Sequence, residues 1–194
     1  LFDYQMTSRV NMEVLNMLNV KYIIFPNQGK PTLQQNPEAN GNVWFVKNVI
    51  AVNSANEEIK SLDSLQTKSS VVVRKDDIKQ NLFFDKYSTA IIKLTKYDVT
   101  SLTYHTNSSS PQFAVFSEIY YKEGWNAYVD GELTPHYKVN YVLRGMIVPA
   151  GKHKIEFKFE PTIIKRGNTI TLTSYALLIL LPLGWFFYEN KKSL

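Results

Sequence analysis

Residues 153–159, His153-Lys-Ile-Glu-Phe-Lys-Phe159, carry the clearest strand pattern in the chain. Ile155, Phe157 and Phe159 alternate with charged residues. Successive side chains of a strand point to opposite faces of its sheet, so this alternation predicts one buried face and one solvent face. The stretch therefore favours a fold built mainly from sheets.

Six further strand-like segments precede this one at short, regular spacing. Asp130-Gly131 is the strongest turn signal between them, because both residues accept a positive φ angle in a two-residue hairpin. Pro149-Ala-Gly151 predicts a second turn. Short strands spaced in this way predict an antiparallel β-sandwich, with a jelly roll as the expected variant. The seven segments are 90–94, 99–106, 113–119, 125–129, 136–139, 142–148 and 153–159.

The first 75 residues mix helix and strand patterns and predict a small α/β unit. Apolar residues recur at helical spacing over 10–18, with Thr7 or Ser8 as the expected N-cap. Ser54-Ala-Asn-Glu57 has the form of a capping box and predicts a helix over 55–65. The remaining expectations are strands at 21–25, 43–52 and 70–74 and a loop at 34–41.

Residues 170–188 contain no charged side chain and predict a transmembrane helix. About 20 apolar residues are needed to cross a hydrocarbon core of about 30 Å. Trp185 and Tyr188 would lie in an aromatic belt at the membrane surface. Two alternatives stay open, a buried helix of a soluble protein and a pair of strands broken at Pro182. The chain is thus divided into an α/β unit (1–75), a polar connection (76–88), a β-sandwich domain (89–165) and the transmembrane helix (170–188).

The charges beside this helix bear on its orientation. Lys191 and Lys192 favour a cytoplasmic C-terminus, although Lys165 and Arg166 flank the other end. We therefore expect residues 1–165 on the extracytoplasmic side. Leu1 is not an initiator Met and no signal segment follows it, so we expect upstream sequence with its own membrane spans.

Composition excludes several kinds of site. The chain has no cysteine, which rules out disulfides and thiolate metal sites. Its 22 Lys and Arg residues give a net charge of +5 but are scattered, so nucleic-acid binding is not expected. The three histidines are far apart in sequence and show no metal-ligand spacing. Asp130 and Glu132 read as turn residues rather than as a catalytic carboxylate pair. We expect no catalytic residue, metal or cofactor in this chain.

Three stretches together resemble a known family. They are 11–24 (Asn11-Met-Glu-Val through Tyr-Ile-Ile24), Asn36-Pro37 with 41–46 (Gly41-Asn-Val-Trp-Phe-Val46), and a third group that includes Tyr120-Tyr-Lys-Glu-Gly-Trp125 and Phe157-Lys-Phe-Glu-Pro161. In this order, before a terminal membrane helix, they resemble the C-terminal region of the YfhO-type bacterial membrane proteins. The resemblance implies a large multi-span protein of the bacterial inner membrane, with residues 1–165 on the periplasmic side. Such a protein looks like a GT-C-type glycosyltransferase using lipid-linked sugars. By the same resemblance, the catalytic carboxylate lies in an early extracytoplasmic loop, outside these residues.

Sugar binding is the remaining activity that residues of this chain suggest. Flat aromatic rings stack on the apolar face of a sugar, although large rings also fill sandwich cores. The candidate contacts are Trp44, Tyr120, Tyr121, Trp125 and Tyr128.

Three functions are therefore open. The first is a non-catalytic C-terminal region of a membrane glycosyltransferase, in contact with the upstream transmembrane region. The second is a membrane-anchored module that binds a glycan or lipid-linked sugar. The third is an assembly module of the cell envelope, for which a large exposed apolar patch would speak.

Overall fold

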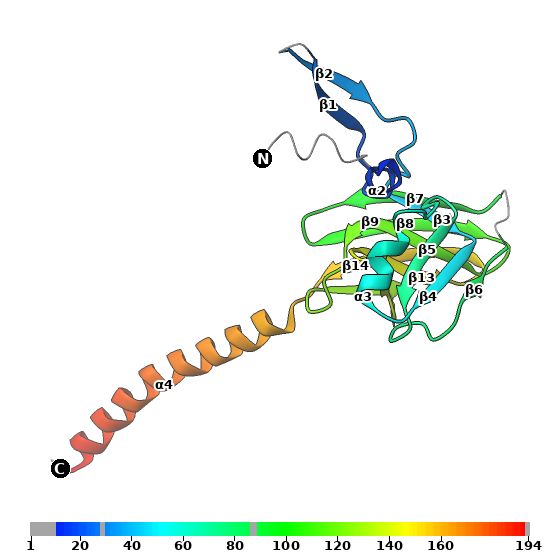
Figure 1. Ribbon diagram of the computed structural model, residues 1–194. Helices are drawn as coiled ribbons and strands as arrows, with labels where there is room; N and C mark the ends of the chain where they lie inside the picture. Colours follow the sequence, from blue (N-terminus) through cyan, green and yellow to red (C-terminus); the bar gives the residue numbers. More distant parts are fainter. Residues whose placement is uncertain (1–10, 28–29, 86–88, 193–194) are drawn as a thin grey trace.

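The computed structural model describes residues 11–27, 30–85 and 89–192. Figure 1 shows a β-rich body, with a short hairpin projecting from it and one long helix leading away. The elements in chain order are α2 (Met12–Met17), β1 (Tyr22–Asn27), β2 (Lys30–Gln35), β3 (Val43–Val46), β4 (Asn48–Val52), α3 (Ala55–Ser61), β5 (Ser70–Arg74), β6 (Leu82–Phe83), β7 (Ile91–Tyr97), β8 (Ser101–Ser108), β9 (Gln112–Ile119), β10 (Trp125–Val129), β11 (Glu132–Thr134), β12 (Tyr137–Val139), β13 (Leu143–Val148), β14 (Gly151–Phe159) and α4 (Thr162–Lys192). We call the described residues before α4, apart from this hairpin, the body.

One sheet of the body has five antiparallel strands in the order β11-β10-β14-β8-β7. In β14, Ile155 and Phe157 are fully buried while the residues between and around them are partly or fully exposed, as their alternation predicts. The β10–β11 hairpin closes through Asp130 (φ 50°) and Gly131 (φ 92°), with Val129 paired to Glu132. The hairpin predicted at Asp130-Gly131 is confirmed.

The other large sheet has seven strands in the order β3-β9-β13-β12-β5-β4-β6. Its β4 and β5 pair in parallel, because α3 crosses between them and returns the chain to the same end of the sheet. The other pairs of described strands in this sheet are antiparallel. The sheet therefore contains a β-α-β unit within an otherwise antiparallel arrangement.

Two apolar cores hold these layers together. Between the two sheets lie Tyr104, Phe116 and Phe157, whose rings meet edge to face with centroids 4.9 to 6.1 Å apart. A second core covers the other face of the seven-stranded sheet, where Met17 of α2 and Leu62, which caps the end of α3, pack on strand residues. The chain is thus mostly β, with two sheets packed face to face, while the jelly-roll connection stays a prediction.

The two cores bear on the expected division of the chain. The seven-stranded sheet combines β3 to β6, from the first 88 residues, with β9, β12 and β13 from the later ones. The connection expected at 76–88 contributes β6, and the second core contains buried residues from both sides of it. Described residues on both sides of the expected connection therefore share one sheet and one core.

Several expected boundaries differ from the structure. The strand expected over 43–52 is two strands that break at Lys47, because β3 pairs with β9 while β4 pairs with β5 and β6. The helix expected over 55–65 ends at Ser61. The loop was expected to begin at residue 34, but β2 continues to Gln35, so the loop begins after that residue. The expected caps Thr7 and Ser8 lie outside the described residues, and Asn11 caps the described helix by accepting hydrogen bonds from the amides of Glu13 and Val14.

Residues 162–192 form one continuous helix, α4, which is longer than the span expected over 170–188. Pro182 lies inside it, so the alternative of two strands broken at this proline is wrong. Its apolar window, within Thr162–Trp185, is long enough to cross a membrane and has no residue buried against the rest of the described chain. A core helix of a soluble protein would be largely covered, so α4 is a membrane-span candidate.

Candidate binding face

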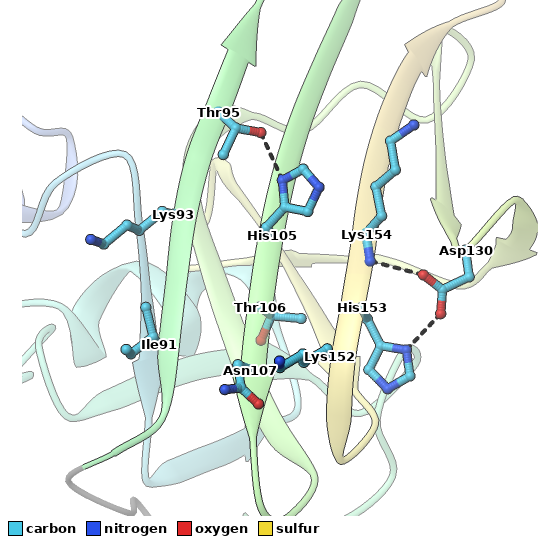
Figure 2. Close-up of a pocket in the computed structure, with 10 residues that line it drawn as sticks. All are labelled: Ile91, Lys93, Thr95, His105, Thr106, Asn107, Asp130, Lys152, His153 and Lys154. Carbon is cyan, nitrogen blue, oxygen red and sulfur yellow. Dashed lines mark hydrogen bonds and ion pairs between the residues drawn. The ribbon is translucent and has the colours of Figure 1, made fainter.

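An open pocket of about 550 Å³ lies on the outer face of the five-stranded sheet (Figure 2). Strands β7, β8 and β14 supply its floor, and Asp130 of the β10–β11 turn closes one side. Most of the side chains that line it are cationic or polar. They are Ile91, Lys93, Thr95, His105, Thr106, Asn107, Asp130, Lys152, His153 and Lys154.

The strand register explains why these residues meet. Lys93 pairs with His105, and His105 pairs with Lys154, so two lysines flank a histidine in one row across the sheet. Side chains directly opposite each other on one face lie about 5 Å apart at their Cβ atoms. The register therefore gathers two ammonium groups and an imidazole on this face.

These lysines differ in their partners. Lys154 Nζ lies 3.1 Å from the Glu156 carboxylate, which offsets its charge. Among the ion pairs of the described residues, none involves Lys93 or Lys152. Each of these two ammonium groups is therefore available to donate hydrogen bonds to an anionic or strongly polar ligand.

His153 and Asp130 form a contact that resembles half of a catalytic triad. His153 Nδ1 lies 2.6 Å from Asp130 Oδ2, and the backbone amide of Lys154 donates to Asp130 Oδ1 at 2.8 Å. His153 Nε2 lies 2.9 Å from the carbonyl oxygen of Ala150. Both ring nitrogens face acceptors, so the ring is best satisfied as an imidazolium that donates twice.

The electrostatics of this pair follow from that geometry. The hydrogen bond to Asp130 raises the pKa of His153 above its ordinary value, and the bond to Ala150 adds to this. The hydrogen bond from His153, with that from the amide of Lys154, lowers the pKa of Asp130. A general base needs a free ring nitrogen, and His153 has none, so the pair fixes two turns against each other, and its two opposite charges offset one another beside the pocket.

The five aromatic residues expected to contact sugar do not form one surface. Trp44 is buried and donates its indole N–H to the carbonyl of Thr67 at 2.9 Å. Trp125 points to the inner side of its sheet, where the Arg144 guanidinium lies 4.4 Å from its ring centroid. Tyr120 is half-buried, with its ring centroid 5.2 Å from that of His136. These three residues pack within the body.

Tyr121 and Tyr128 are the more accessible members of that set. Tyr121 is 48% exposed and stacks on Phe159 beside the start of α4. Tyr128 lies on the outer side of β10 and donates its hydroxyl to Glu160 at 2.6 Å, with the Lys158 ammonium over its ring. Neither lines the pocket of Figure 2, so the structure separates the predicted aromatic contacts from the basic pocket.

A family model, that of the bacterial membrane protein YfhO, matches residues 58–171. The chain belongs to the YfhO family. The match runs from α3 to the first turns of α4 and includes the whole five-stranded sheet with its pocket. The comparisons with curated proteins and with solved structures gave no match.

In this YfhO-family chain, three ionisable side chains interact in the interior: Arg144, Glu118 and His136. Arg144 is 2% exposed and donates through Nε to the carbonyl of Ile119 at 3.0 Å. Burial raises the pKa of Glu118 and lowers that of Arg144, while each charge favours the other. Burial, with the positive charge of Arg144, lowers the pKa of His136 to about 4. Sequence reasoning did not single out this group, because no spacing rule links residues on different strands.

Within residues 11–27, 30–85 and 89–192, no three His, Asp or Glu side chains gather as a possible metal site. Hydrogen bonding in the basic pocket is the chemistry that the outer sheet face offers.

Proposed function

We propose that this chain is the non-catalytic, extracytoplasmic C-terminal region of a multi-span YfhO-family glycosyltransferase of the bacterial inner membrane. Its outer sheet face would hold the polar part of a substrate, either an envelope glycan or a lipid-linked sugar. The observation that carries this proposal is a basic, open pocket on a β body that a membrane-span helix follows directly.

The position of the pocket suits a polar substrate beside a membrane. Lys152 to Lys154 lie at the start of β14, and α4 begins just after the end of that strand. A strand advances about 3.3 Å per residue, so His153 lies about 20 Å along β14 from its last residue, Phe159. A glycan that projects this far from the membrane would reach the pocket.

Binding rather than reaction is what the pocket chemistry supports. His153 has no free ring nitrogen, and Asp130 accepts hydrogen bonds from both His153 and the amide of Lys154. Lys93 and Lys152 can donate hydrogen bonds to hydroxyl, carboxylate or phosphate oxygens. The GT-C-like chemistry of the proposal would then belong to residues outside this chain.

Complementation of a strain that lacks the gene tests the proposal. The Lys93→Ala/Lys152→Ala double variant is compared with the wild type and with Lys60→Ala/Lys68→Ala, which removes two exposed lysines outside the pocket. The readout is the sugar composition of isolated envelopes after acid hydrolysis. We expect the deletion strain to lack one sugar, the pocket variant to restore it severalfold less than wild type, and the control pair to restore it fully.

Two results would contradict parts of this proposal. Unchanged envelope sugars in the deletion strain would exclude the glycosyltransferase role. Full restoration by the pocket variant would exclude substrate binding at the outer face. The alternative, a membrane-anchored carbohydrate-binding or assembly module without enzyme activity, is favoured by the open pocket and predicts that envelope polysaccharide binds the chain while the sugar composition is unchanged.

A further inference from the structure

Large apolar side chains are exposed at the end of the body that adjoins α4. Val99 is 86% exposed, and Tyr97, Ile119 and Tyr121 are 68%, 59% and 48% exposed. We call these four residues the membrane-proximal rim. An exposed residue of this kind is unremarkable alone, but a cluster at one end of a domain marks a contact surface.

Hydrogen bonds place the rim beside the helix start. The amide of Phe159, the last residue of β14, donates to the carbonyl of Thr100 in the β7–β8 turn at 2.8 Å. The amide of Glu160 donates to the carbonyl of Gly124, after β9, at 2.6 Å. The two turns that carry the rim therefore lie against the last residues before α4, which matches their place in Figure 1.

The second of these turns is packed rather than loose. Tyr121 stacks on Phe159 with ring centroids 6.5 Å apart, and Trp125 lies 5.4 Å from the same ring. Gly124 is buried, and a Cβ atom at this position would collide with the rings of Phe159 and Tyr121. The turn that carries Tyr121 is thus packed against the residues just before α4.

Helix geometry sets the height of the rim above the membrane. Arg166 is exposed in the second turn of α4, where its charge belongs at the head groups rather than in hydrocarbon. A helix rises 1.5 Å per residue, so Thr162 lies about 6 Å above Arg166. The end of the body therefore reaches the level of the head groups.

From this placement, we propose that the membrane-proximal rim inserts into the lipid–water interface of the membrane that α4 crosses. Tyrosine suits this layer because its ring is apolar while its hydroxyl can hydrogen-bond to water or head groups. Charged Lys96, Asp98 and Lys122 lie beside the apolar side chains, as expected at an interface and not inside a protein core. The contact would orient the body so that the basic pocket faces sideways, above the membrane.

Fluorescence quenching by lipids tests this inference on the whole chain in nanodiscs. The chain has no cysteine, so Val99→Cys and Ser109→Cys each give one site for an NBD label. Both residues are exposed, and they flank β8, an eight-residue strand about 26 Å long. Lys122→Cys, in the turn between β9 and β10 and next to Tyr121, gives an independent probe beside the rim.

We expect lipids with a doxyl group high on the acyl chain to quench the labels at 99 and 122 at least twofold, and to leave the label at 109 unchanged. Equal, weak quenching at all three sites would overturn the inference. A blue-shifted label at 99 that lipids do not quench would also overturn it, because a protein would then cover the rim. The inference requires only that α4 crosses a membrane, so it is tested independently of the glycosyltransferase proposal.

Discussion

The two large sheets of this chain differ in how buried residues are distributed along their strands. In the five-stranded sheet one face packs on the core and the other meets solvent, so β8 and β14 alternate between buried and more exposed residues. In the seven-stranded sheet both faces are covered at β5, whose Val71, Val72 and Val73 are all fully buried. A strand whose sheet has one solvent-exposed face therefore shows alternating apolar and polar residues in the sequence. A strand that is covered on both faces shows a continuous run of apolar residues instead.

The largest effect should follow from breaking the core of the five-stranded sheet. Phe157→Ala removes a fully buried ring that contacts Tyr104 and Phe116, so we expect the free energy of unfolding to fall by about 3–5 kcal/mol. Lys154→Ala, exposed on the same strand, should change it by less than about 0.5 kcal/mol. Urea titration in detergent micelles measures both, and similar losses would contradict a one-sided sheet.

Adjacent substitutions in β5 test whether the seven-stranded sheet is covered on both faces. Val71→Thr and Val72→Thr each bury a hydroxyl, on opposite faces. We expect both to lower the free energy of unfolding by about 1–3 kcal/mol. If one of the two variants were as stable as the wild type, one face of this sheet would be open to water.

Two histidines sharpen the contrast between the inside and the outside of the five-stranded sheet. Burial lowers the pKa of His136 to about 4, whereas the contact with Asp130 raises the pKa of His153 above 6.5. The stabilisation from neutral His136 is thus complete above pH 6.5 and is lost as the pH falls toward about 4. NMR titration, with His136→Gln and His153→Gln to assign the signals, should find the two pKa values on opposite sides of 6.5. Two ordinary values would contradict the burial of one ring and the pairing of the other.

The smallest expected effect concerns the exposed His153–Asp130 pair. The raised pKa of His153 gives stability that is complete below pH 6.5 and is lost as the pH rises through the folded value. The lowered pKa of Asp130 gives stability that is complete above pH 3.8 and is lost at lower pH. Asp130→Asn should therefore cost less than about 1 kcal/mol, and most between pH 3.8 and 6.5. A loss that stays constant from pH 4 to 9 would exclude the ion pair as its cause.

The sequence predicted the elements that carry a clear local signal, such as an apolar run, a regular alternation or a turn dipeptide. The predicted bounds of β5 and β10 agree with the structure, as do the Asp130-Gly131 hairpin and the presence of a long C-terminal helix. The break at Lys47 was missed because only the partners of β3 and β4, far away in the sequence, reveal it. The short strands β6 and β11 are too brief to show any periodicity.

The site was harder to predict than the fold. Alternation shows that Lys93, His105 and Lys154 point outward, but it does not show that β14 lies beside β8 and β8 beside β7. For the same reason, His153 was read as an isolated histidine and Asp130 only as a turn residue. The aromatic candidates were chosen by type, and Trp44 and Trp125 pack inside because large rings are needed there.

The location of the body is the central claim, and labelling of single cysteines in spheroplasts tests it directly. Lys93→Cys places a thiol at the pocket, and Ser193→Cys places one after α4, in a chain that otherwise has no cysteine. We predict that a membrane-impermeant maleimide labels position 93 in intact spheroplasts and position 193 only after permeabilisation. Labelling of position 93 only after permeabilisation would place the body in the cytoplasm and contradict the account.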